Sequence, residues 1–246
     1  MPASGYCLAD LHIHSALSPC ADDRMTPAAV TAQARRVGLD IMALTDHNSV
    51  RNCLAFLNWD SPDLWIIPGM ELQTREGVHL ICLFPGMAAA WEWQDFVDRH
   101  LPDLPNRSER FGHQYLFNAA GEVTGEEHRL LLNSTTLAWD EVLQRVPEYG
   151  GLVYPAHIDR PSFSVLANLN RIPEERSLRI VEISAQADPA RLTRDYPHLA
   201  GARLIRSSDA HRLDEVGRVC TKLPVAIREW DALQSALTSP IPETGG

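Results

Sequence analysis

Short apolar segments alternate with helical segments along this chain of 246 residues. Continuous apolar runs such as Ile41–Leu44 and Val78–Phe84 are typical of strands that are buried on both faces. Helix signals stand between such runs: Thr26 is a good N-cap, Pro27 suits the first helical position, and Gly38 is a natural stop. Because strands and helices alternate at short spacing, the sequence predicts an α/β fold with a parallel sheet.

The expected elements follow one another in a regular order. Strands are expected at Tyr6–Ile13, Ile41–Leu44, Leu64–Ile67, Val78–Phe84, Leu152–Tyr154, Arg179–Ser184, Arg203–Ile205 and Val219–Leu223. Helices are expected at Thr26–Val37, Cys53–Asn58, Ala88–His100, Trp139–Tyr149, Phe163–Leu169 and Arg228–Leu237. The polar segment 102–136 departs from this order, and we interpret it as an insertion over one end of a single domain, residues 1–238. Residues 239–246 are expected to form a flexible tail.

The charge balance narrows the classes of partner. The chain has 32 acidic and 22 basic residues and a formal net charge of −10. Long duplex nucleic acid is therefore not expected as a partner, because neutralising its phosphates needs clustered Lys and Arg. A small phosphorylated substrate or nucleotide held by metal ions is compatible with this charge, because bound cations can be the largest local charges.

Three further features bear on location. The chain has no apolar run long enough to span a membrane, and its first ten residues lack the pattern of a signal peptide. Its five scattered cysteines fit a reducing compartment better than a disulfide framework. We therefore expect a cytoplasmic protein without membrane contact, and the sequence leaves open whether it forms a homo-oligomer.

Histidines and carboxylates gather where the predicted strands end. His12 and His14 project to the same side of the first strand, since residues i and i+2 of a strand share a face. The other candidates in such positions are Asp46, His47, Glu71, His157, Asp209 and His211, with His79 inside the strand Val78–Phe84. Active sites of barrel enzymes are built at this edge, so we expect the functional site there.

Each of these candidate residues also has a simpler structural explanation. His79 could be a hydrogen-bonded core histidine, and Asp46 could only cap a turn. Asp22 and Asp23 could be surface turn residues. Cys20, close to Asp22, is a weaker candidate for a ligand or redox role.

Imidazoles and carboxylates together suit Zn, Mn or Fe. Two or three such ions can hold a phosphoryl oxygen and lower the pKa of bound water, so that a metal-bound hydroxide attacks phosphorus in line. The same chemistry would suit amide hydrolysis. Arg160 is a candidate phosphate clamp, because a guanidinium fork matches phosphate oxygens.

Four motifs resemble the signature motifs of the PHP (polymerase and histidinol phosphatase) superfamily. They are Asp10–Ser15, Thr45–Asn48, Pro155–His157 and Ser208–His211, and they occur in the family's order. The resemblance covers the chain from Ala9 to Gly217. It implies a distorted (β/α)7 TIM-like barrel with a trinuclear metal cluster at the carboxyl ends of its strands. The characterised members of this family are mostly phosphoesterases.

The resemblance also implies which residues hold the metal ions. The first ion would be held by His12, His14, Glu71 and Asp209, with Glu71 bridging. The second would be held by Asp22, His47 and His211, and the third by Glu71, His79 and His157. Asp22 is preferred to Asp23 because it stands four residues before Thr26, as the family's acid stands before its helix.

Asp46, Arg160 and His211 are the residues expected to take part in catalysis, with Asp46 orienting a ligand. Within the superfamily, the stand-alone phosphoesterases fit best. The chain is too short to carry a polymerase, and Leu17, Ser18 and Cys20 stand where histidinol phosphatases have a histidine. We therefore expect a metal-dependent hydrolase of small phosphorylated compounds, nucleotides or short oligonucleotides. A metal-binding regulatory protein without turnover and an amidohydrolase acting on C–N or lactone bonds are the alternatives.

Overall fold

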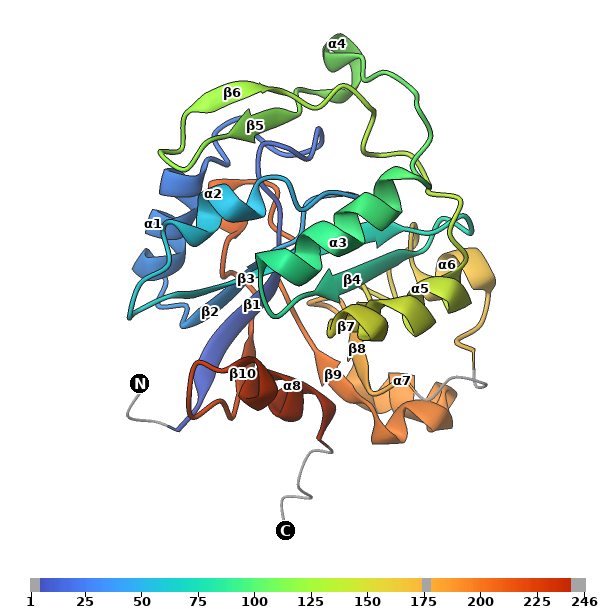
Figure 1. Ribbon diagram of the computed structural model, residues 1–246. Coiled ribbons are helices and arrows are strands. Elements are labelled where there is room, and N and C mark those ends of the chain that lie inside the picture. The colour runs from blue at the N-terminus through green and yellow to red at the C-terminus, as the bar shows by residue number, and fades with distance from the viewer. Residues whose placement is uncertain (1–4, 174–177, 240–246) are drawn as a thin grey trace.

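The computed structural model describes residues 5–173 and 178–239 (Figure 1). Its strands are β1 (Cys7–Ile13), β2 (Ile41–Leu44), β3 (Trp65–Gln73), β4 (His79–Leu83), β5 (Tyr115–Phe117), β6 (Val123–Glu126), β7 (Leu152–Pro155), β8 (Ile180–Glu182), β9 (Arg203–Ile205) and β10 (Thr221–Leu223). Its α-helices are α1 (Pro27–Arg36), α2 (Cys53–Leu57), α3 (Met87–Asp98), α4 (Ser108–Phe111), α5 (Trp139–Arg145), α6 (Val165–Leu169), α7 (Pro189–Asp195) and α8 (Trp230–Thr238). Short 3₁₀ helices are η1 (Val146–Tyr149), η2 (Pro197–Gly201) and η3 (Leu213–Glu215). None of the described helices combines the length and the apolar content that crossing a membrane requires. Of the expected tail, residues 240–246 lie outside the described part of the chain.

Six strands form one mixed sheet in the order β10-β1-β2-β3-β4-β7. Strands β1, β2 and β3 are parallel, whereas β4 is antiparallel to both β3 and β7. The parallel pair β8–β9 continues the curve, since Ile158 N donates to Glu182 O at 3.0 Å and Ile13 forms a bridge with Ala210. The strands therefore curl strongly around a common interior (Figure 1).

Two expectations about the sheet need correction. The expected parallel sheet is wrong at β4, because only residues 74–78 join β3 to β4, too few for a parallel crossover. The expected seven-stranded barrel is also not closed by a continuous ladder. In residues 5–173 and 178–239, ladder pairing stops between β7 and β8, and between β9 and β1. The fold is thus an α/β half-barrel with a mixed sheet.

Local signals explain several element boundaries. Thr26 caps α1 as expected, with its Oγ1 accepting from Ala29 N at 3.3 Å, and Gly38 ends the turn with φ of 78°. Strand β3, however, runs on through Gly69 to Gln73. A Cβ at Gly69 would lie 2.9 Å from Cys82 O, so this glycine permits close pairing with β4 and does not end the strand.

Apolar side chains pack on both faces of the sheet. One cluster fills the interior of the half-barrel and includes Leu11, Ala43 and Tyr154. Leu233 and Leu237 of α8 complete this inner cluster at one end of the half-barrel. A second, outer cluster lies between the sheet and the surrounding helices. Burial on both faces explains why the strands are apolar runs without clean alternation.

The segment 102–136 contains α4 and the β5–β6 hairpin, which Figure 1 shows at the opposite end of the molecule from α8. Two asparagines of the barrel hold it by side-chain hydrogen bonds. Asn48 Nδ2 donates to Leu131 O at 2.8 Å, and Asn52 Nδ2 donates to Tyr115 O at 3.0 Å. The hairpin is therefore fixed above the loops that follow β1 and β2.

Candidate metal centre

A bulge in β1 orients the side chains of two histidines toward the interior of the half-barrel. The pairing of β1 with β2 changes register between Asp10 and Ile13. Leu11 packs in the inner cluster, whereas Ile13 packs in the outer one. Because a bulge reverses the alternation of side chains, His12 and His14 point inward together.

Hydrogen bonds fix the proton on the outer nitrogen of both rings. His12 Nδ1 donates to Glu182 Oε1 at 3.1 Å. Ser18 Oγ donates to Asp46 Oδ1 at 2.7 Å, so it accepts from His14 Nδ1 at 2.9 Å. Such partners fix the tautomer and leave the lone pair of each Nε2 to face the interior.

The Nε2 lone pairs of His12 and His14 face the carboxylates of Asp209 and Glu71. His12 Nε2 and His14 Nε2 are 3.2 Å apart, and Asp209 Oδ1 lies 3.2 Å from the first and 3.1 Å from the second. Glu71 lies 3.3 Å from both nitrogens. Lone pairs and carboxylates this close in a buried site require positive charge between them, which a divalent cation supplies.

Glu71, only 1% exposed, is the centre of the cluster. Its Oε2 lies 3.0 Å from His47 Nδ1, and its Oε1 lies 2.7 Å from His79 Nδ1 and 3.2 Å from His157 Nε2. Glu71 Oε2 and His47 Nδ1 have no hydrogen-bond partner, although both are buried. Orphaned polar atoms of this kind are costly in a protein interior unless an ion satisfies them.

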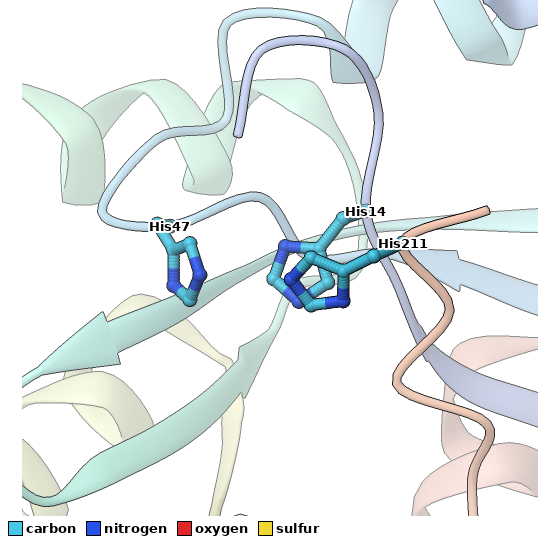
Figure 2. A group of neighbouring side chains, drawn as sticks. All are labelled: His14, His47 and His211. Atoms are coloured by element: carbon cyan, nitrogen blue, oxygen red, sulfur yellow. The ribbon is translucent and has the colours of Figure 1, made fainter. Parts of the chain in front are cut away.

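A third group comprises His14, His47 and His211, whose ring nitrogens come within 4.8 Å of one another (Figure 2). The rings of His14 and His211 are 4.1 Å apart between centroids, and those of His14 and His47 are 4.6 Å apart. The three side chains come from loops after β1, β2 and β9. Together with the two groups around Glu71, they give ligands for a multinuclear centre.

The buried charges shift the pKa values of these groups. Burial lowers the pKa of His12, but Asp209, Glu182 and Glu71 outweigh this and raise it well above its ordinary value. Burial raises the pKa of Glu71, but His79, His12 and His47 bring it well below its ordinary range. Burial lowers the pKa of His79 to about 4. The carboxylates are thus ionised, and a metal ion competes with a proton for His12.

Three residues at the site adopt the left-handed backbone conformation without being glycine. They are Asn48 with φ of 49°, His157 with φ of 28° and Asp209 with φ of 50°. Such conformations cost free energy and persist where the surrounding structure holds them. Their concentration at the cluster indicates a backbone shaped to place these side chains.

The structure brings together every predicted ligand except Asp22. That carboxylate faces away and forms an ion pair with Arg24, in which Nε and Nη2 donate at 2.8 and 2.7 Å. Asp22 therefore lies outside the three groups, which corrects the expectation. Asp46 is buried but contacts none of the clustered rings directly, because its oxygens accept from Ser15 and Ser18.

The cluster opens into two neighbouring cavities. One of about 300 Å³ is lined by His47, Glu71 and His79, with Phe163 at its wall. The other, of about 570 Å³, is lined by polar groups that include Ser184, Gln186, Ser207, Ser208, Glu215 and Arg218. Arg160 lines both cavities, and its Nη1 donates to Asp209 Oδ2.

Glu182, which orients His12, was not among the predicted site residues, and Cys20 was predicted only as a weaker candidate. Glu182 is 2% exposed and also accepts from His157 N at 3.2 Å. Cys20 Sγ lies 3.1 Å from His211 Nε2. Partial desolvation raises the pKa of this thiol, but His47 and His211 outweigh it and lower the pKa to about 5. A charged residue in the apolar strand Arg179–Ser184 was the available signal for Glu182.

Replacing Glu182 by Gln is expected to weaken metal binding roughly 10- to 100-fold, because the partner of a metal-binding histidine sets its tautomer and basicity. Glutamine keeps the volume of the side chain but removes its charge. Competition with a chromophoric chelator measures the affinity. Glu122→Gln, at an exposed position of the insertion, is the control, and equal affinities in the two variants would contradict this role.

Comparisons with known proteins agree with this geometry. A protein-family model described as PHP-associated matches residues 193–239, a stretch that begins within α7 and contains Asp209 and His211. Within this segment the chain is similar to PHP-associated proteins. No curated protein matches the sequence.

Solved structures match the fold of this chain over nearly its whole length. The lesion-specific endonuclease EndoQ from Pyrococcus furiosus has a TM-score of 0.73 and 18% identity, covering 98% of this chain but 57% of that one. A candidate metal-dependent phosphoesterase from Bifidobacterium adolescentis has a TM-score of 0.59 and 16% identity, covering 97% and 98%. An amidohydrolase from Chromobacterium violaceum has a TM-score of 0.56 and 17% identity, covering 95% and 98%. At these identities the matches establish the fold. The chain spans little more than half of the endonuclease.

Proposed function

We propose that this protein is a metal-dependent phosphoesterase of the PHP superfamily that acts on small phosphorylated compounds, nucleotides or short oligonucleotides. The observation that carries the proposal is the position of the buried ligand groups. They open directly into a cavity whose wall includes the guanidinium of Arg160. Two or three divalent ions, Zn, Mn or Fe, fit the mixed imidazole and carboxylate ligands.

When bound, such ions supply an activated water and offset the charge that develops on phosphoryl oxygens. The chain's own groups hold and orient the reactants. Glu71 lies between two ligand groups, and Asp209 joins the first group to Arg160. Arg160 is 41% exposed on its side chain and can present N–H donors to a phosphate in either cavity. Glu182 and Ser18 hold His12 and His14 in the tautomer that a ligand needs.

The size of the cavities supports a small substrate. The first cavity, of about 300 Å³, has room for a phosphoryl group, and the second, of about 570 Å³, has room for a polar leaving group. The net charge of −10 disfavours a long duplex. Turnover of small phosphate esters by metal-loaded protein, tested beside a nucleotide panel and short oligonucleotides, examines the proposal. Metal-loaded protein that hydrolyses none of them would overturn it.

An amidohydrolase is the second candidate, because the same ligands suit activation of water for attack on a carbonyl carbon. The likeness of the fold to the Chromobacterium violaceum amidohydrolase favours including it. Amide and lactone substrates in the same panel separate the two activities. A protein that binds metal and turns over no substrate in either set would instead fit a regulatory role.

Replacing Arg160 by Ala is expected to lower kcat/KM for a phosphate ester by roughly 10- to 100-fold, as a charged hydrogen bond to substrate is lost. Arg160→Lys keeps the charge but loses the paired donors, so we expect an intermediate loss. Arg194→Ala, an exposed position on α7, is the control. Elemental analysis shows whether metal content is retained. Unchanged kcat/KM in Arg160→Ala would contradict a substrate contact.

A further inference from the structure

The thiol of Cys20 lies beside the group formed by His14, His47 and His211. Its Sγ is 3.1 Å from His211 Nε2 and also interacts with the His47 ring. His211 Nδ1 donates to Asp209 O at 2.9 Å, so its Nε2 offers a lone pair to the sulfur side. Cys20 also lines the 300 Å³ cavity into which Glu71 and His79 open.

A second observation points to a ligand at the same place. His47 is 5% exposed, and its Nδ1, which faces Glu71 Oε2 at 3.0 Å, forms no hydrogen bond. Figure 2 shows His14, His47 and His211 converging from different loops. The expected carboxylate of Asp22 is absent from this group because it pairs with Arg24. Asp22 was the acid predicted for this site alone, and instead the sulfur of Cys20 lies 3.1 Å from His211 Nε2 at the edge of the group.

We propose that Cys20 is a metal ligand that completes the site formed by His14, His47 and His211. A thiolate is a softer ligand than a carboxylate, so this site takes Zn²⁺ in preference to Mn²⁺. The inference requires a metal at this site but does not require that the substrate be a phosphate ester.

The loop that carries Cys20 is held in place by several backbone contacts. Ala21 N donates to Ser18 O at 2.8 Å, and Asp22 N donates to His211 O at 2.9 Å. The second bond fixes the loop directly to the segment that carries His211. The backbone that carries this sulfur is therefore held in place by the fold, as a ligand site requires.

The insertion supports the same loop from above. Gly112 has φ of 101°, and a Cβ there would lie 1.9 Å from Pro19 O, the carbonyl directly before Cys20. Only glycine permits so close an approach. Tyr115 N also donates to Ala16 O at 2.8 Å. The loop is thus packed between the barrel and the insertion.

Cobalt spectroscopy tests the proposal without measuring turnover. Metal-stripped wild-type protein loaded with Co²⁺ should show a thiolate-to-cobalt charge-transfer band in the near ultraviolet. Cys20→Ala should lose this band and bind Zn²⁺ at least about 10-fold more weakly at one site. Cys220→Ser, at the half-buried cysteine outside the cluster, should keep both. A band that persists in Cys20→Ala, or that is missing from wild type, would overturn the proposal.

Alkylation gives an independent measurement on the unmodified chain. Cys20 is exposed, whereas Cys7, Cys53 and Cys82 are buried, so iodoacetamide labelling followed by peptide mass spectrometry reports on Cys20. Zn²⁺ should slow its labelling by at least about 10-fold, since a metal-bound thiolate is not free to attack, and Mn²⁺ should protect it less. Equal rates with and without Zn²⁺ would overturn the proposal. Neither measurement depends on the substrate, so failure of the phosphoesterase assignment is seen separately.

Discussion

Replacing Glu71 by Gln is expected to abolish turnover, with a loss on the order of 1,000-fold or more. This one carboxylate lies within 3.3 Å of nitrogens from His12, His14, His47, His79 and His157. Glutamine preserves its size but cannot act as an anion between two cations. Metal content should fall together with activity, because two ligand groups share this residue.

Elemental analysis and steady-state kinetics of the same preparation measure both effects. Glu92→Gln, on the exposed face of α3, is the matched control and should retain metal and activity. Circular dichroism of the variant should match that of wild type, because the side-chain volume is unchanged. A folded Glu71→Gln variant with wild-type turnover would remove the central residue from the proposed centre.

Removing the metal ions by chelation is expected to stop turnover and lower thermal stability. Binding to the native state alone stabilises a protein by about 4 kcal/mol when the free ion is at 1,000 times its Kd. For a domain of this size, that difference corresponds to a change in Tm of roughly 8–16 °C. Chelation should lower the Tm, because the ligands come together only in the folded chain. His12 and Asp209, for example, are far apart in sequence but 3.2 Å apart in the fold.

Calorimetry of chelated and reloaded protein measures the change in Tm, and adding back Zn²⁺, Mn²⁺ or Fe²⁺ separately identifies the ion that restores activity. Reloading with Mg²⁺ is a control, because this ion prefers oxygen ligands and the cluster is rich in imidazole. A chelated protein that keeps its Tm and its turnover, with elemental analysis showing no metal, would contradict a metal-dependent hydrolase.

The sequence predicted well those features that depend on local spacing. His12 and His14 share a face because of their separation by two residues, and the loops after β1, β2 and β9 carry His14, His47 and His211 to one place. Strand and helix positions followed from apolar runs and capping residues, as at Thr26. These features require only the periodicity of a strand and the rule that chemistry lies at strand ends.

Features that depend on long-range pairing were not predictable in the same way. Glu182 contacts His12 across 170 positions, and no local pattern marks that partnership. Asp22 was chosen for its distance from Thr26 along the chain. That criterion does not include the ion pair with Arg24, which holds the Asp22 carboxylate at the surface. The third strand was expected to end at Ile67, whereas Gly69 permits close pairing with β4, so that β3 continues and includes Glu71.

The bulge between Asp10 and Ile13 makes the number of residues in β1 as important as their identity. Because side chains alternate, losing or gaining one residue there would turn His12 and His14 toward the surrounding helices. Conservative replacements among the apolar positions of this strand leave that geometry intact. The candidate metal centre therefore depends on the number of residues in β1. Inserting or deleting one residue in this strand would disrupt the centre even though every ligand residue is still present.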